Sequence, residues 1–539
     1  MATSGIKSMI LQSVLYATTN QQPLLCPSTA TWQCSPTPSI NTVRLTKLSV
    51  EASRGSRGRR EAGEEKLLNN NYSLPSPAYP NRIAPSMIIA APDNFNPNVQ
   101  TPPSPTVPKP IAPIVTPLPL KPKPTATPEK PATPTPTTSF PRLTQEADQI
   151  AAERAWKYFE RNWNSQTGLV NSVDNLPWTT WWDQGSALLG IHAAYQLGLL
   201  PQDVFQKRMN TLLQTLEKLP LPATGLPNKA YSTRTAQMRH LNDTPDPKGT
   251  SGWSALDMGR FLLALHVMRS HYPEYSDSPK GDSFASRINR IVARWQTSKL
   301  VKDGWLNGAI PKAGKLLEVQ EGRLGYEQYA AHSLKLWNIQ ASNALSNPPV
   351  KTVEIDGIKL QIDERNFKNS GATNYLTNDP YLLWGLEIGW NDAVKPQVQN
   401  LFKVQEQRFK RTGILTAVNE DSLDRPPYFL YYSVYANGQS WQAVNTTGKA
   451  YPQLRFVSTK AAFSWFALMP DQPYTKKLRD FAQNLSDKNR GYLSGRYENS
   501  QLGVNASVDI NTNAIVLESL LYKAIGRHPL VLESSEIKN

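Results

Sequence analysis

The chain is poor in cysteine and histidine and has no long apolar run, and each shortage excludes a class of protein. The only cysteines, Cys26 and Cys34, both precede the region that we expect to fold. This excludes a disulfide scaffold and a thiolate metal site in the main domain. The six histidines form no HExxH pair, so a histidine-built metalloprotease site is also excluded, and we predict no metal. No run approaches twenty apolar residues, so we expect no integral membrane span.

Nucleotide-binding motifs are missing as well. Neither GxGxxG nor GxxxxGK[ST] stands between a strand and a helix, so we predict no cofactor. The net charge of +15 comes from 58 Lys and Arg against 43 Asp and Glu. Residues 1–141 hold 13 of these bases and only 6 of the acids, so the rest of the chain has a small surplus for its length. That surplus does not predict a nucleic-acid partner.

Proline is abundant, but mainly in one segment. Fifteen of the 45 prolines lie between residues 101 and 141. Such a tract forms an extended spacer, so we expect a Pro/Thr-rich linker at 92–141. The remaining predicted parts are a disordered, low-complexity N-terminal region at 1–91, the main folded domain at 142–530 and a flexible tail at 531–539.

The N-terminal region contains a weak candidate export signal. Lys7 precedes a short apolar stretch, Met9–Ala17. A transit peptide, suggested by the absence of acids before Glu51, and a mis-assigned start are the alternatives. From the signal and the spacer together we expect an extracytoplasmic or secreted protein of the periplasm or envelope.

Long amphipathic helical patterns follow Pro141. The periodicity predicts twelve helices, at 144–162, 180–198, 202–218, 253–271, 284–298, 326–342, 380–392, 394–410, 430–438, 458–468, 474–486 and 511–525. The ninth is the weakest, because PYFLYYSVYANG is rich in aromatic residues. A β-hairpin is predicted at 352–361, where alternating residues flank an Asp-Gly turn.

Short glycine-containing segments recur between the predicted helices. They contain Gly168, Gly225, Gly304, Gly371, Gly413 and Gly491. Six helix pairs with such turns predict an all-α (α/α)6 toroid of helical hairpins, with short β stubs and one β-hairpin insertion. Its inner helices would present their N-terminal ends to one mouth. An open α-solenoid is the alternative, although solenoid repeats keep a stricter length.

Acidic residues at this mouth are the candidate catalysts. Asp183 and Asp257 occupy first turns of inner helices, where the helix dipole stabilises a carboxylate that acts as a base or nucleophile. Glu327 lies between two tyrosines at another helix start, where partial burial would raise the pKa of a general acid. The structural alternatives are helix capping for Asp183 and an ion pair with Arg260 for Asp257.

Aromatic and polar residues near the same mouth are candidate sugar-binding groups, because Trp and Tyr rings stack on the apolar faces of sugars. Thirteen of the fourteen tryptophans follow residue 141. The predicted substrate-binding residues are Trp181, Trp182, Trp253, Tyr326, Asn228, Tyr231, Arg234, Asp379, Tyr381, Glu420, Asp421, Arg496 and Glu498. A core or loop role is the alternative for each of them. An acidic, aromatic mouth favours a neutral glycan.

Several strings in one order carry a family resemblance. They are SALDMGR, GYEQYAA, NDPYLLWGLE, STKAAFSW, GRYE and NTNAIVLESLLY. They resemble a bacterial family known as domain of unknown function 3131, over roughly residues 143–529. That family is similar to the six-hairpin (α/α) glycosidases, including glucoamylase-like and β-1,2-glucan-processing groups. The resemblance implies a toroid and glycan chemistry, but it brings no established catalytic pair.

We therefore predict a glycoside hydrolase or transglycosylase that acts on an envelope or extracellular polysaccharide, most plausibly a β-glucan. Glu327 would protonate the glycosidic oxygen, and Asp183 or Asp257 would activate water from the opposite face. A polysaccharide or oligosaccharide is the expected partner, and we expect a monomer.

Two other functions fit the same pattern. A non-catalytic glycan-binding or envelope assembly module would retain the toroid and use the long spacer equally well. A polyuronate lyase would need a tyrosine, a histidine and an arginine, for which Tyr326, His332 and Arg234 are the candidates.

Overall fold

The computed structural model of the chain describes residues 141–276 and 281–532. All of them belong to one of the two contact units of the chain, Ala78–Asn539. Three predicted regions lie wholly or almost wholly outside the described residues: 1–91, 92–141 and 531–539.

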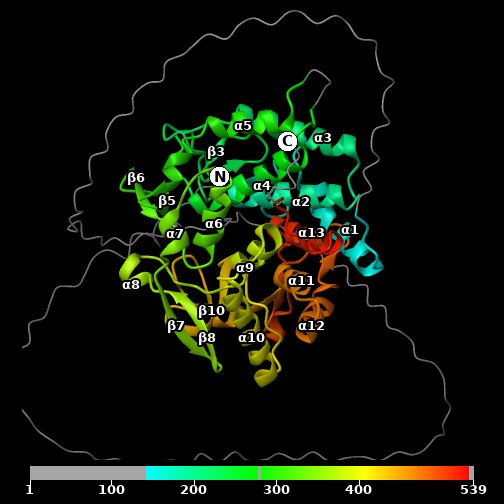
Figure 1. The fold of residues 1–539 in the computed structure, drawn as a ribbon, viewed down its shortest axis with the longest axis vertical. Helices are drawn as coiled ribbons and strands as arrows, with labels where there is room; N and C mark the ends of the chain where they lie inside the picture. Colours follow the sequence, from blue (N-terminus) through cyan, green and yellow to red (C-terminus); the bar gives the residue numbers. More distant parts are fainter. Residues whose placement is uncertain (1–140, 277–280, 533–539) are drawn as a thin grey trace, which may run out of the picture. The chain divides into compact units, whose positions relative to one another are not determined.

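Six helices form the inner layer of the domain. They are α2 (Trp181–Gln196), α4 (Ala255–His271), α6 (Tyr326–Lys335), α9 (Asp379–Leu383), α11 (Thr459–Leu468) and α13 (Ile510–Ala524). Each contacts the next in this order, and α13 returns to α2, which closes a ring. Figure 1 shows α13 between α2 and α11. Because neighbours surround the inner helices, α2 is buried on all faces from its first turn to Tyr195.

Capping side chains determine where four inner helices begin. Thr180, Ser254, Ser458 and Asp509 each accept a hydrogen bond from the backbone N–H three residues further on. Such a bond satisfies an amide that the helix itself leaves free. The inner helices therefore start in polar sequence.

Six helices form the outer layer and alternate with the inner ones along the chain. They are α1 (Glu146–Asn162), α3 (Gln202–Glu217), α5 (Phe284–Ala293), α7 (Ser342–Ser346), α10 (Lys395–Thr412) and α12 (Pro473–Ala482). α1 packs on α13, α5 on α4, α7 on α6 and α12 on α11. The outer helices are amphipathic: α5 buries Phe284, Ile288 and Ile291 and exposes Arg290.

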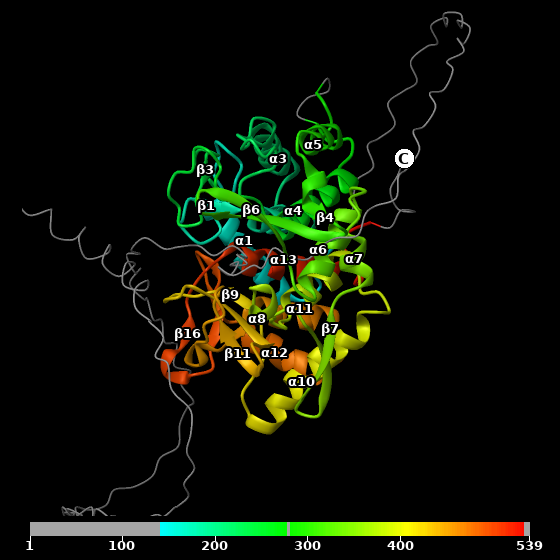
Figure 2. The ribbon, with the colours of Figure 1, turned by 90° about the vertical axis from the view of Figure 1, so that its left-hand side faces the viewer.

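Short antiparallel sheets connect the helices. They are β1 (Trp178–Thr180), β2 (Ala230–Ser232) and β3 (Met238–Arg239); β4 (Val301–Lys302), β5 (Trp305–Lys312) and β6 (Lys315–Gln320); β7 (Val350–Ile355) and β8 (Ile358–Asp363); β9 (Glu420–Ser422), β10 (Phe429–Ala436) and β11 (Gln439–Val444); β12 (Phe456–Ser458), β15 (Gly495–Tyr497) and β16 (Val504–Asn505); and β13 (Ser486–Asp487) and β14 (Gly491–Tyr492). β1 and β12 lead directly into α2 and α11, so their sheets stand at N-terminal ends of the ring helices. Figure 2 shows β1, β9 and β16 on one side of the helices.

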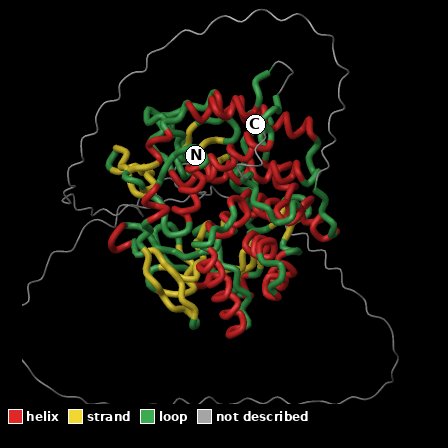
Figure 3. The backbone as a smooth tube through the Cα atoms, viewed as in Figure 1, coloured by secondary structure: helices red, strands yellow, loops and turns green. Residues whose placement is uncertain are grey.

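Two predicted local features are confirmed, but the prediction of a single hairpin is wrong, because β5–β6 and β10–β11 are also hairpins. The hairpin at 352–361 is β7–β8, with Ile355 paired to Ile358 around the Asp-Gly turn, and it projects from the helices (Figure 3). All six glycines of the predicted turns have positive φ angles, between 70° and 108°. Side chains rarely adopt these angles, which explains why glycine recurs there.

Five helix predictions are corrected. The helices expected at 284–298 and 474–486 end earlier, at Ala293 and Ala482. The segment 430–438 is strand β10 rather than a helix, because it pairs with β9 on one edge and β11 on the other. The helix expected at 380–392 stops earlier, as α9 and a π-helical turn, Trp384–Ile388, that ends before Gly389. The helix expected at 326–342 ends at Lys335, and the separate α7 follows it. One further short helix, α8 (Phe367–Ser370), follows the β7–β8 hairpin.

Candidate active site

Polar side chains meet where the inner helices begin. The first turns of the six helices carry Asp183, Asp257, Glu327, Asp379, Lys460 and Asn511. Asn511 of α13 donates a hydrogen bond to Asp183 of α2 over 2.9 Å. Lys460 of α11 lies 3.0 Å from Asp379 of α9. The ring thus brings together acids that are far apart in the sequence.

Buried carboxyl groups outnumber buried ammonium groups in this region. Seven acids form what we name the acidic cluster: Asp183, Asp257, Glu321, Asp379, Glu420, Asp421 and Asp509. Each is at most 6% exposed. Two buried lysines, Lys229 and Lys460, lie among them. Two ammonium groups cannot balance seven buried carboxylates, so the surplus of buried acids favours protonated forms.

The acidic cluster has two halves, one around Lys460 and one around Lys229. In the first half, Lys460 lies between Asp379 and Asp421. Its Nζ lies 3.0 Å from Asp379 Oδ1 and 3.9 Å from Asp421 Oδ1, and Asn419 also donates to Asp379, over 2.8 Å. Burial raises the pKa of Asp421 well above its usual value, and the charge on Lys460 opposes this only in part. Asp379 is therefore the better paired of the two carboxylates.

Asp257 occupies the other half, with Lys229 and Glu321. Glu321 accepts hydrogen bonds from the backbone N–H groups of Ala255 and Leu256, so it holds the start of α4 from outside the helix. Neither carboxylate oxygen of Asp257 accepts a hydrogen bond within the described part of the chain. Burial, and next the charge on Glu321, raise the pKa of Asp257 well above its usual value. These surroundings favour the protonated form of Asp257.

Tyrosines connect the two halves. The Tyr375 and Tyr431 rings stack with centroids 4.1 Å apart, and Tyr326 meets Tyr375 edge-on at 6.0 Å. Tyr326 donates a hydrogen bond of 2.6 Å to Glu420, and burial raises the pKa of Glu420 well above its usual value. Burial also raises the pKa of Tyr431, with further contributions from Tyr375, Glu420 and Asp257. Tyr431 is therefore close to both halves.

Asp183 is the best hydrogen-bonded acid of the cluster. Its carboxylate accepts from the Ser172 hydroxyl, from Thr180 Oγ1 over 2.8 Å and from Asn511 Nδ2 over 2.9 Å. Burial raises its pKa, and these hydrogen bonds lower it. Its capping box with Thr180 is the structural role that the sequence offered as the alternative. Asn511 and Tyr375 are partly exposed, so the cluster reaches the surface beside them.

Glu327 belongs to a different group of charges. Arg365 Nη2 lies 2.6 Å from Glu327 Oε2 and 2.7 Å from Asp363 Oδ2, and Gln320 donates to Glu327 over 2.8 Å. We name the two acids Glu327 and Asp363 and the two bases Arg323 and Arg365 the balanced cluster, because their charges are equal in number. Burial raises the pKa of Glu327 and the charge on Arg365 lowers it. The assignment of Glu327 as proton donor stays a prediction, and this pairing favours a structural carboxylate.

The tryptophans expected to form sugar platforms are buried. Trp181 donates its indole N–H to the carbonyl of Asn228, and Trp253 donates to another backbone carbonyl, over 2.8 and 2.9 Å. Trp182 lies against Tyr326, with ring centroids 6.0 Å apart. All three rings are under 5% exposed, so the core alternative describes them in this structure.

The other predicted binding residues are spread over several environments. Buried outside the acidic cluster are Asn228, Tyr231 and Tyr381; exposed are Arg234 and Arg496. Glu498 binds Arg408 and Arg455 in ion pairs of 2.7 and 3.1 Å. No hydrogen bond or ion pair of the described residues joins Tyr326, His332 and Arg234, the candidates for a lyase. His332 packs on Trp384 instead, and burial lowers its pKa to about 4.

The sequence analysis missed six members of the site. They are Lys229, Glu321, Tyr375, Tyr431, Lys460 and Asp509. Lys460 had a detectable signal, because it occupies the first turn of an inner helix as the candidate acids do. Glu321 and Tyr431 had none, because they come from a loop and from a strand that the periodicity assigned to a helix.

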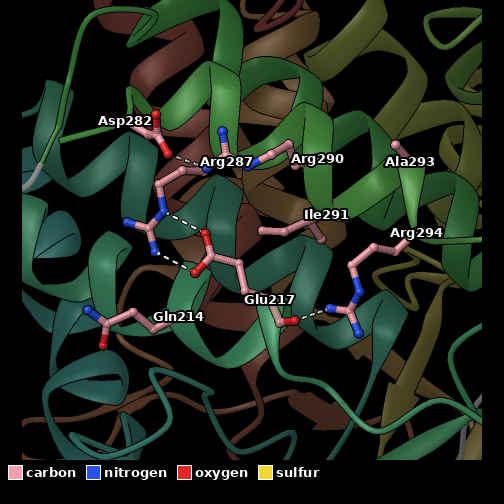
Figure 4. A pocket seen from close by; sticks show the side chains of 8 residues that line it. All are labelled: Gln214, Glu217, Asp282, Arg287, Arg290, Ile291, Ala293 and Arg294. Atoms are coloured by element: carbon pink, nitrogen blue, oxygen red, sulfur yellow. Dashed lines mark hydrogen bonds and ion pairs between the residues drawn. The ribbon is translucent and has the colours of Figure 1, made fainter.

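A cavity of about 700 Å³ lies outside the ring, between α3 and α5 (Figure 4). Arg287 lies 2.7 Å from Glu217 and Arg290 lies 2.6 Å from Asp282, while Arg294 donates to backbone carbonyls. Since its arginines already have partners, this cavity leaves little free charge for a ligand. Over the described ranges, no group of three or more His, Cys, Asp or Glu is arranged to hold a metal ion.

Comparisons with known proteins show the family and the fold. Residues 150–526 match the family described as Protein of unknown function (DUF3131), and the chain belongs to that family. No curated protein sequence matches the chain. None of the helices between residues 141 and 532 that the structure describes has the length and hydropathy of a membrane span.

Two solved structures share the fold at low sequence identity. One is an endo-β-1,2-glucanase from Chitinophaga pinensis in complex with sophorotriose and glucose, with a TM-score of 0.50 and 14% identity, over 72% of this chain and 97% of that chain. The other is a glucoamylase candidate from Bacteroides fragilis NCTC 9343, with a TM-score of 0.50 and 13% identity, over 74% and 97%. The described domain thus resembles an (α/α)6 glycosidase in its fold.

Proposed function

We propose that the ring domain is a glycoside hydrolase or transglycosylase that acts on a β-glucan by carboxylate acid/base catalysis. The observation that carries this proposal is Asp257, a buried acid with a raised pKa and no hydrogen bond to its carboxylate. Support comes from the likeness in fold to an endo-β-1,2-glucanase. The extracytoplasmic setting belongs to the same proposal.

In this proposal Asp257 is the proton donor. Cleavage of a glycosidic bond needs an acid that is still protonated at the working pH and a second, ionised carboxylate. Burial favours the protonated form of Asp257, although the charge on Lys229 opposes this in part, and Lys460 provides a positive charge beside Asp379. We assign the second role to Asp379, the carboxylate that lies 3.0 Å from Lys460. Asp183 and Glu327 remain alternatives for the two roles.

The substrate would approach beside Tyr375 and Asn511, the partly exposed residues that touch the cluster. Tyr375 stacks on Tyr431, and both rings lie next to carboxyl groups. Aromatic faces next to acids suit a sugar ring held at a reacting bond. Tyr375, the partly exposed ring of this pair, therefore takes the platform role that the sequence analysis gave to tryptophans.

The test is product release from a panel of β-glucans, which includes β-1,2-glucan, read by mass spectrometry. The full chain is compared with Asp257→Asn, Asp379→Asn and Glu327→Gln. Oligosaccharides that appear with the parent and are lost with Asp257→Asn support the proposal. Loss with Glu327→Gln but not with Asp257→Asn would return the proton donor to Glu327.

A non-catalytic glycan-binding module is the second candidate. The observation in its favour is burial: each member of the acidic cluster is at most 6% exposed, so a substrate must displace covering residues to reach them. Retention on a glucan affinity gel without products from any glucan would select this function.

A further inference from the structure

A cavity of about 470 Å³ lies apart from the acidic cluster, where α8 meets the β7–β8 and β10–β11 hairpins. Residues that line it include Lys351, Phe367, Lys368, Asn374, Tyr435 and Asn437. The two hairpins and α8 lie outside the ring helices, so the cavity is built by segments inserted between them.

The cavity contains a buried hydrogen-bond acceptor without a donor. Asn374 is 4% exposed, and its Nδ2 donates to the carbonyl of Asp363 over 2.9 Å. This bond leaves the amide oxygen of Asn374 without a partner, and the hydroxyl of the adjacent, buried Thr373 has none either. Buried polar atoms normally have partners, which bound water or the hydroxyl groups of a ligand can supply. A sugar carries such hydroxyl groups.

An exposed aromatic ring borders the same cavity. Phe367 is 39% exposed, one of only four large apolar side chains of the described residues with that degree of exposure. Across from it, Gly448 has a φ angle of 79°, and a Cβ atom there would come within 2.8 Å of Thr373 Oγ1 and 3.6 Å of the Phe367 ring. Glycine therefore keeps this space open beside an aromatic face, an arrangement that suits the apolar side of a sugar ring.

The charge of the cavity is positive, unlike that of the acidic cluster. Lys351 and Lys368 are exposed, and neither forms an ion pair with another described residue. The residues found to line the cavity include no Asp or Glu. A ligand with a carboxylate would be attracted here and repelled by the acidic cluster.

We propose that this cavity binds a saccharide that carries a uronic-acid carboxylate. Phe367 packs on the sugar ring, the amide oxygen of Asn374 accepts from a hydroxyl, and Lys351 and Lys368 face the carboxylate. The inference goes beyond the proposed hydrolysis, because binding here requires no turnover. It also adds to the substrate class: a polymer with both neutral and acidic sugars would place an acidic sugar in the cavity and a neutral one in the ring.

The experiment is calorimetric titration of the full chain with tetragalacturonate, and with cellotetraose as the neutral probe of equal length. We expect binding of the acidic probe that weakens at high salt. The double variant Lys351→Ala/Lys368→Ala should weaken it by about tenfold, since each exposed charge contributes up to about fivefold. Phe367→Ala should weaken it by about five- to tenfold. The matched controls, Lys359→Ala on the same hairpin and Leu317→Ala, another exposed apolar side chain, should leave it unchanged.

The proposal is overturned by the absence of tetragalacturonate binding, by equal affinity for both probes, or by an equal loss with Lys359→Ala. The result is separable from the proposed hydrolysis. Uronate binding without products from any β-glucan would support this binding site and contradict the proposed hydrolase activity. Products from a glucan without uronate binding would do the reverse.

Discussion

The acidic cluster and the balanced cluster lie beside neighbouring inner helices but differ in the ratio of buried acids to buried bases. In the balanced cluster, two carboxylates, Glu327 and Asp363, share Arg365, and Arg323 adds a second guanidinium. In the acidic cluster, seven acids have two lysines. The comparison teaches that the surroundings of a carboxylate, rather than its place in a helix, decide whether it holds the fold or is available for proton transfer.

The largest effect is expected on removal of Asp257, the acid of the acidic cluster that we propose as the proton donor. Asp257→Asn should reduce product release by about 100- to 10,000-fold, the usual contribution of a general acid. Its thermal stability should stay close to that of the parent, because asparagine is uncharged like the protonated acid. Initial rates and a thermal melt measure both. A variant that keeps a third or more of the parent rate would remove Asp257 from the mechanism.

The next test breaks the balanced cluster. Arg365→Ala leaves Glu327 and Asp363 buried without their shared partner and should lower the free energy of unfolding by about 3 to 5 kcal/mol. Adding Glu327→Gln to that variant should restore part of the loss. Urea denaturation measures the change. The control is Arg411→Ala, whose exposed pair with Asp356 should contribute less than about 1 kcal/mol. Equal losses in both arginine variants would contradict the proposed difference.

A pH series sharpens the comparison from the acidic side. The pKa of Asp421 is raised in the folded state, so the folded protein binds this proton more tightly than the unfolded chain does. Its contribution to stability is therefore complete below the ordinary pKa of 3.8 and is lost as the pH rises toward the folded value. Asp421→Asn should flatten the fall in stability by at most about 1.4 kcal/mol per pH unit. Urea melts between pH 4 and 8 check this, and a steeper fall in the variant would contradict it.

The smallest effects are expected at the exposed arginines. Arg234→Ala and Arg496→Ala should each change the free energy of unfolding by less than about 0.5 kcal/mol, because both side chains are exposed. If they bind substrate as predicted, KM should rise by a few fold while kcat stays constant. Unchanged KM in both variants would remove them from the predicted binding residues.

The sequence predicted the ring better than it predicted the site. Helical periodicity and the glycine turns are local signals, and the structure confirms them at Gly168 and the five related turns. The segment PYFLYYSVYANG misled because β10 is buried on both faces, which hides the alternation that identifies a strand. The ion pair between Glu327 and Arg365 could not be predicted from the sequence. The two residues are 38 positions apart, and the β7–β8 hairpin between them brings Arg365 back to Glu327.

The closure of the ring has a consequence for how the chain is made. The helix that packs on α2 from the far end of the described chain and donates a hydrogen bond to Asp183 is α13, the last helix of the described residues to be synthesised. Until α13 is made, α2 lacks one of its two ring neighbours. Because α2 is buried along almost its whole length in the folded domain, the unfinished domain exposes apolar surface of α2 to solvent. Arrest before Ile510 should therefore yield a chain that depends on a chaperone to remain in solution.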